Sequence, residues 1–261
     1  MAIPVQTNQL SKFDLLVKKN ELSPKIASQL KEVLSISEIV LLCDDSGSMQ
    51  SVIKEPGSNK TTTRWLELKN LAAKLIEIIT SVNPNGLDIF FMNRPTLRNV
   101  ISMDGLQRTF SDLPNGYTPL IGTLQRIYID KANIPEEKQL LILILTDGRQ
   151  SDGSNSQLYS VLYNKRSNVH ISIAECTDDE EEMEFLDSFK NRIKNYDNTD
   201  DFREEMRKVK RLQGPNFKFD YTDYVIKVLL STFIKDYFNI DQTSSTNYAY
   251  YNDSCDCCIL L

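Results

Sequence analysis

Two short apolar runs, each followed by an aspartate, constrain the fold of this chain more than any other feature. Ile39–Cys43 leads directly into Asp44, and Leu140–Leu145 leads through Thr146 into Asp147. Unbroken apolar runs of this length are typical of strands that are covered on both faces. Such strands belong to parallel sheets flanked by helices. The two runs therefore predict an α/β fold with a doubly wound, mostly parallel central sheet.

Strand and helix patterns alternate along the rest of the chain, as this fold requires. Apolar residues at helical spacing predict helices near 64–81, 119–131, 155–166 and 223–238. Further strands are predicted at 87–93, 99–103, 169–174 and 217–219. The strand at 169–174 alternates apolar and polar residues, which predicts a position near the sheet edge with His170 exposed. The highly charged segment 195–210 is expected to be mobile or helical.

These elements divide the chain into three parts: an N-terminal helical extension at 1–36, one domain at 37–239 and a flexible tail at 240–261.

The formal net charge of −6 argues against nucleic-acid binding through phosphate neutralisation. The N-terminus has no basic start followed by an apolar segment, and no apolar run approaches the roughly 20 residues of a membrane span. We therefore expect a cytoplasmic protein, in which Cys43 and Cys176 are buried reduced thiols.

Hard oxygen ligands follow the two central strands. Asp44, Ser46 and Ser48 alternate after the first strand, Asp147 follows the second, and Thr118 lies in the loop before the helix at 119–131. The carboxyl ends of parallel strands meet at one edge of a sheet, where ligand sites collect. Carboxylate and hydroxyl oxygens, completed by water, fill the octahedral shell of Mg²⁺ and suit Mn²⁺, whereas zinc prefers nitrogen and sulfur. The sequence predicts a site for Mg²⁺ or Mn²⁺.

Three segments in this order resemble the metal-ion-dependent adhesion site of von Willebrand factor A domains: Asp44-Asp-Ser-Gly-Ser-Met49, Gly116-Tyr-Thr-Pro-Leu120 and Leu145-Thr-Asp-Gly148. The resemblance covers about 37–239, and intracellular members such as the copines are the nearer analogy. It implies direct metal binding by Ser46 and Ser48, and by Thr118 in a high-affinity state. Asp44 and Asp147 would bind directly or through water, and a carboxylate of a partner protein would take the sixth position.

The same resemblance implies that the last helix, predicted at 223–238, slides in relatives that switch affinity. Asp45 occupies a variable position of the motif and is not counted as a ligand. The acidic run 177–182 follows a strand at the same edge of the sheet, with Thr177 as a candidate helix cap. This run would repel an acidic partner and favour a mixed or basic contact surface.

The last four residues, Cys258-Ile-Leu-Leu261, fit the C-a-a-X pattern for prenylation, and a terminal leucine favours a geranylgeranyl group. Stable anchoring takes two signals, and palmitoylation of Cys257 or Cys255 would supply the second. An unmodified end and an incidental cysteine cluster are the alternatives. Lipidation would hold the protein at the cytoplasmic face of a membrane.

The residues favour a metal-dependent protein-binding module that acts as a lipid-anchored intracellular adaptor, and not an enzyme. A hydrolase or phosphotransferase that uses the same metal is an alternative, but no histidine or cysteine base and no phosphate-binding glycine loop accompanies the ligands. A structural subunit with a vestigial metal site is the third alternative. Each of these functions would leave the same ligand motif in the sequence.

Overall fold

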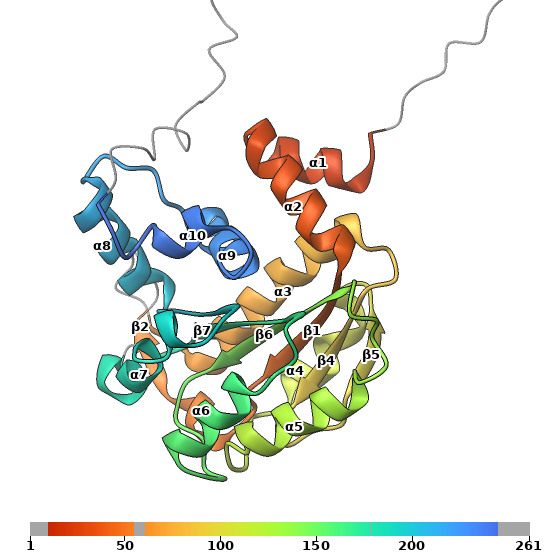
Figure 1. The fold of residues 1–261 in the computed structure, drawn as a ribbon, viewed down its shortest axis with the longest axis vertical. Helices are drawn as coiled ribbons and strands as arrows, with labels where there is room; N and C mark the ends of the chain where they lie inside the picture. The colour runs from red at the N-terminus through yellow and green to blue at the C-terminus, as the bar shows by residue number, and fades with distance from the viewer. Residues whose placement is uncertain (1–9, 55–60, 178, 245–261) are drawn as a thin grey trace, which may run out of the picture.

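The computed structural model describes residues 10–54, 61–177 and 179–244, and places a six-stranded sheet between layers of helices (Figure 1). The strand order is β5-β4-β1-β6-β7-β8, and every pair is parallel except β4–β5. The predicted doubly wound, mostly parallel sheet is confirmed. The strands are β1 (Ser37–Cys43), β4 (Leu87–Phe91), β5 (Leu97–Val100), β6 (Gln139–Thr146), β7 (Val169–Glu175) and β8 (Tyr196–Thr199), and β2 (Val52–Lys54) and β3 (Thr61–Thr63) form a separate pair.

The helices cover both faces of the sheet because strand residues alternate between two cores. In β1, Leu41 and Cys43 face one core, whereas Val40 and Leu42 face the other. The first core is shared with α1 (Lys12–Lys19), α2 (Pro24–Ile36), α3 (Arg64–Val82), α4 (Gln107–Ser111), α8 (Phe202–Gln213), α9 (Tyr221–Leu230) and α10 (Lys235–Asn239). The second is shared with α5 (Leu120–Asp130), α6 (Asn155–Tyr163) and α7 (Glu180–Asp187). Cys43 and Cys176 are buried free thiols, as predicted.

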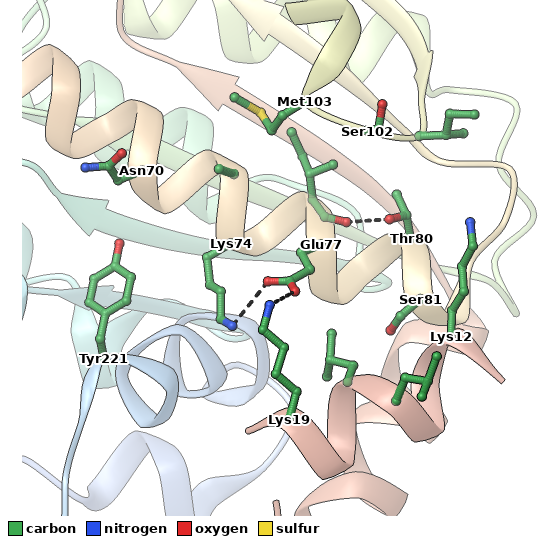
Figure 2. Close-up of a pocket in the computed structure, with 15 residues that line it drawn as sticks. Lys12, Lys19, Asn70, Lys74, Glu77, Thr80, Ser81, Ser102, Met103 and Tyr221 are labelled. Atoms are coloured by element: carbon green, nitrogen blue, oxygen red, sulfur yellow. Dashed lines mark hydrogen bonds and ion pairs between the residues drawn. The ribbon is translucent and has the colours of Figure 1, made fainter. Parts of the chain in front are cut away.

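The N-terminal extension is two capped helices that pack on the first core. The Ser23 side chain caps α2, and Pro24 occupies its first turn. A groove of about 720 Å³ runs between α1 and α3 (Figure 2). At this groove Glu77 of α3 accepts from Lys19 of α1 at 2.7 Å and from Lys74 at 3.2 Å. The Lys19–Glu77 pair joins α1 to α3, beside the buried Phe13 and Leu16 side chains that pack the extension on the first core.

The predicted position of 169–174 near the sheet edge is confirmed, since β7 lies next to the edge strand β8, but the predicted exposure of His170 is wrong. β7 lies between β6 and β8, and every one of its residues is buried. The His170 ring stacks on Phe233 with a centroid separation of 3.7 Å, and its nitrogens lie 3.1 Å from the Thr232 carbonyl and 3.2 Å from the Gln139 side chain. Burial lowers the pKa of His170 to about 4. The polar side chains of β7 are thus buried and do not face solvent.

Three further expectations for the last third of the chain are wrong in part. The charged segment 195–210 contains a sheet strand, β8, in addition to a helix. Residues 217–219 form no strand, and Phe217 and Phe219 insert into the first core from irregular backbone. The predicted helix 223–238 is two helices, α9 and α10, separated at residues 231–234. Ile240 and Asp241, which follow α10, are buried.

Candidate metal site

The Asp44 carboxylate lies fully buried at the carboxyl end of β1. The backbone N–H of this residue donates to the Leu145 carbonyl at 2.9 Å, which extends the β1–β6 ladder to the site. One carboxylate oxygen accepts from the Ser46 N–H at 2.9 Å, and the other accepts from the Thr146 hydroxyl at 2.6 Å. The carboxylate is therefore fixed in direction by groups that follow both central strands.

A chain of hydrogen bonds connects three of the other predicted ligands. The Ser46 and Ser48 hydroxyl oxygens are 3.0 Å apart, and the Ser48 hydroxyl donates to Asp147 Oδ1 at 2.9 Å. Ser46 and Asp147 are buried, whereas Ser48 is exposed. Ser48 and Asp147 are 99 residues apart in sequence. The structure thus brings Ser46, Ser48 and Asp147 together, with the solvent side of the cluster at Ser48.

The loop that carries Thr118 meets the same segment through its backbone. The Gly47 N–H donates to the Gly116 carbonyl at 3.1 Å, and the Asn115 N–H donates to the Asp45 carbonyl at 2.8 Å. Gly116 has φ +113°, and a Cβ there would lie 2.5 Å from the Asn93 side-chain oxygen, so glycine is required at this close approach. Thr118 is buried, and its N–H donates to Ser151 Oγ at 3.0 Å, which fixes the backbone of this residue.

Two arginines, which the sequence reasoning missed, neutralise carboxylates at this edge. Arg64 Nη1 lies 3.0 Å from Asp147 Oδ2, and Arg94 Nε lies 3.2 Å from Asp45 Oδ2. The second Asp45 oxygen accepts from the Asn93 N–H at 2.8 Å, so this carboxylate is directed toward Asn93 and Arg94. One signal was present in the sequence. Arg64 is the first residue of α3, where the helix dipole disfavours a cation unless an anion compensates it.

The donor set fits a hard divalent cation. Burial and then the charge of Asp147 raise the pKa of Asp44 to about 6, because two carboxylates share a water-poor space. A cation at this point would relieve that repulsion. Within the described parts of the chain, no group of three or more His, Cys, Asp or Glu side chains is placed to hold a metal. The set therefore depends on serine and threonine hydroxyls, which suit Mg²⁺ or Mn²⁺ and not zinc.

No protein-family model matches the chain, and no curated protein does. Similar solved structures include a von Willebrand factor type A protein from Catenulispora acidiphila, with 16% identity and a TM-score of 0.42. That match covers 67% of this chain, which spans 42% of the Catenulispora protein. The strand order of the observed sheet is that of a Rossmann-like, doubly wound fold. A manganese-loaded TRAP protein of Plasmodium vivax is similar at 15% identity, a TM-score of 0.38 and coverage of 65% of this chain and 70% of that one.

Proposed function

We propose that this chain is a divalent-metal-dependent protein-binding module. The observation that carries the proposal is the convergence of Asp44, Ser46, Ser48 and Asp147 at the carboxyl ends of β1 and β6. These four side chains and Thr118 would hold Mg²⁺ or Mn²⁺, and the metal would supply an electrophilic position for an oxygen ligand. Ser48 is the exposed member of the set, so a partner carboxylate would approach from its side.

The position of the histidine supports binding over hydrolysis. His170 pairs in register with Leu141, six residues before Asp147 on the neighbouring strand. At about 3.3 Å per residue, the imidazole lies roughly 20 Å from the candidate ligands. The His170 ring is also buried, and with a pKa of about 4 it is neutral at physiological pH. Since His170 is the chain's single histidine, the site lacks the most common general base.

We further propose that the module is an adaptor anchored to the cytoplasmic face of a membrane through Cys258. This cysteine, together with Cys255 and Cys257, lies outside the described residues, and the prenylation pattern requires Leu261 to be the C-terminal residue. None of the helices in the described ranges is sufficiently long and apolar to cross a membrane. Gln213 Nε2, at the end of α8, donates to the Ile240 and Thr243 carbonyls at 2.8 and 2.9 Å, which fixes the segment after α10 against α8.

The binding function is tested with the full chain immobilised and exposed to a cell lysate in Mg²⁺, in Mn²⁺ or in EDTA. We expect a set of proteins that is captured with either metal and lost with EDTA. Ser48→Ala should lose the same proteins, whereas Ser51→Ala, at an exposed serine outside the ligand set, should retain them. Equal capture in metal and EDTA contradicts the proposal. Hydrolysis of a phosphoester that disappears with Asp147→Ala would establish the enzyme instead.

Membrane anchoring is tested separately by fractionating eukaryotic cells that express the full chain. We expect the protein in the membrane fraction and the Cys258→Ser variant in the soluble fraction. The matched control is Ser254→Ala, which leaves the three cysteines and the C-a-a-X pattern intact. An unchanged distribution of Cys258→Ser rejects prenylation as the anchor without affecting the metal-dependent function.

A further inference from the structure

A hollow of about 590 Å³ lies between the start of β8 and the break between α9 and α10. Thr232 and Phe233 line it, and both also contact His170 near the start of β7. His170 lies roughly 20 Å from the candidate metal ligands along the strand direction. The hollow is therefore at the amino-terminal end of the strands, whereas the candidate metal site is at their carboxyl ends.

The exposed charged side chains that line this hollow are all cationic: Arg192, Lys194 and Lys235. In the described part of the chain, no carboxylate lines the hollow, and none forms an ion pair with these three side chains. The Arg192 guanidinium lies 4.8 Å from the centre of the Tyr159 ring, a contact that orients it without neutralising its charge. Three cations without counter-ions give the hollow a positive potential, which attracts anions.

The acidic side chains of the neighbouring segments have cationic partners of their own. Asp236 follows Lys235 in sequence but pairs with Lys25 of α2 at 3.8 Å. Lys190 also lines the hollow, and its buried ammonium lies 3.3, 3.8 and 3.6 Å from Asp187, Asp197 and Asp241. These carboxylates are thus engaged by Lys190 within the protein, and the charge of the three exposed cations remains available to a ligand.

A fourth cation lies beside the hollow and strengthens its potential. The Lys165 ammonium, in the loop before β7, donates to the Lys194 carbonyl. Burial, and then the positive charge of Lys194, lowers the pKa of Lys165 to about 8. An anion in the hollow would relieve the repulsion between these two ammonium groups.

The position of the hollow in the chain favours the surface of a membrane as the source of that anion. α10 contributes Lys235 and Phe238 to the lining, and the tail that carries Cys258 follows this helix. The chain from 244 to 258 can span at most roughly 50 Å, so a lipid on Cys258 would keep the hollow close to the same bilayer. Stable anchoring takes two signals, one of which can be a basic surface, and the tail at 240–261 contains no lysine or arginine.

We propose that the hollow lined by Arg192, Lys194 and Lys235 binds anionic lipid headgroups and is the second membrane signal of this chain. The inference rests on the proposed anchoring, because a lipid on Cys258 would bring the hollow to a bilayer. It goes further by naming the class of lipid and by placing the signal on the folded domain instead of on a second acyl chain. The candidate metal site, at the other end of the sheet, would then face away from the membrane.

The test is co-sedimentation of the unlipidated full chain with vesicles of phosphatidylcholine, with and without about 50% phosphatidylserine, in about 0.05 M salt, where screening is weak. We expect binding only to the anionic vesicles. Lys194→Gln/Lys235→Gln should bind them about thirtyfold more weakly, which corresponds to about 1 kcal/mol per lysine. The matched control, Lys54→Gln/Lys69→Gln, removes two charges from β2 and α3 and should stay within about twofold of the wild type.

Both double variants should keep the melting temperature of the wild type, because Lys194 and Lys235 are exposed and make no ion pair within the described residues. Equal binding to the two kinds of vesicle, or no binding to the anionic one, overturns the inference. Inorganic phosphate is titrated in parallel. Its binding through Lys194 and Lys235 without binding to vesicles would show a site for a soluble anion, and would also overturn the inference.

Cell fractionation separates this inference from the proposed anchoring. Lys194→Gln/Lys235→Gln keeps the C-a-a-X pattern and should move part of the protein from the membrane fraction to the soluble fraction. A wild type found only in the soluble fraction overturns the proposed anchoring, whereas vesicle binding by the unlipidated chain does not depend on prenylation. A double variant that stays in the membrane fraction as fully as the wild type shows that the hollow is not the second signal.

Discussion

Replacing Asp44 by asparagine should stabilise the metal-free protein while removing its response to metal. The introduced side chain would keep the shape of the buried carboxylate, and its oxygen can still accept from the Ser46 N–H. Its amide group can donate to the Thr146 hydroxyl, which now donates to Asp44 at 2.6 Å and has the Gly148 carbonyl at 3.5 Å as another acceptor. The substitution therefore removes one charge from the site with little loss of hydrogen bonding.

The size of the effect follows from the pKa of Asp44, which burial and the Asp147 charge raise from 3.8 to about 6. A carboxyl with a raised pKa binds its proton more tightly in the folded state, so its contribution to stability is lost as pH rises from 3.8 through about 6. At about 1.4 kcal/mol per pKa unit, the ionised Asp44 costs roughly 3 kcal/mol at pH 8. For a chain of this size, that corresponds to several degrees in melting temperature.

The assay is thermal unfolding of the wild type and Asp44→Asn at pH 4 and pH 8, each in EDTA and in saturating Mg²⁺. In EDTA the variant should melt higher at pH 8, and the difference should shrink at pH 4, where Asp44 is largely protonated. Mg²⁺ should stabilise only the wild type, by an amount that grows with its concentration. A variant that is less stable than the wild type at pH 8 in EDTA, or that still responds fully to Mg²⁺, would refute this reasoning.

Two other substitutions test the surroundings of the site. Gly116→Ala should lower the free energy of unfolding by about 1–3 kcal/mol and weaken Mn²⁺ binding, because the new Cβ meets Asn93 at 2.5 Å and displaces the loop that carries Thr118. Urea unfolding and calorimetry measure the two effects. Gly105→Ala, with no atom within 4 Å of its Cβ, is the control and should change neither quantity. Glu175→Gln should stabilise the protein more at pH 8.5 than at pH 5, by about 2 kcal/mol or more in urea unfolding. The reason is that burial raises the Glu175 pKa to about 8, so the wild type loses stability as pH rises from 4.5 to 8. A stability difference that does not depend on pH would contradict this.

The central strands and helices could be predicted from the sequence because their buried residues form local apolar patterns. β6 spans Gln139–Thr146, as its apolar run predicts, and the stripe of apolar residues predicts α3 to within one residue at each end. The Thr63 side chain accepts from the Leu66 N–H and fixes the start of that helix. The candidate ligands were equally readable, since each follows a buried strand or precedes a predicted helix.

The last third of the chain was less predictable because its burial depends on distant partners. β8 has the sequence Tyr-Asp-Asn-Thr, and its polar residues are buried. Asp197 of this strand lies 3.8 Å from the buried Lys190 ammonium, and Lys190 in turn lies 3.6 Å from Asp241. No apolar period marks such a strand. Likewise, the break between α9 and α10 lets Phe233 stack on His170, a contact that neither local segment specifies.

The same distinction limits what a ligand motif can say about a metal. Asp44, Ser46 and Ser48 are neighbours in sequence, so their convergence follows from one strand end. Arg64 reaches Asp147 across 83 residues, and its charge enters the site only through the packing of α3. A ligand motif therefore specifies which oxygens meet the ion but leaves the total charge around it open. The charge of such counter-ions is set by the packing of the fold, which the motif does not encode.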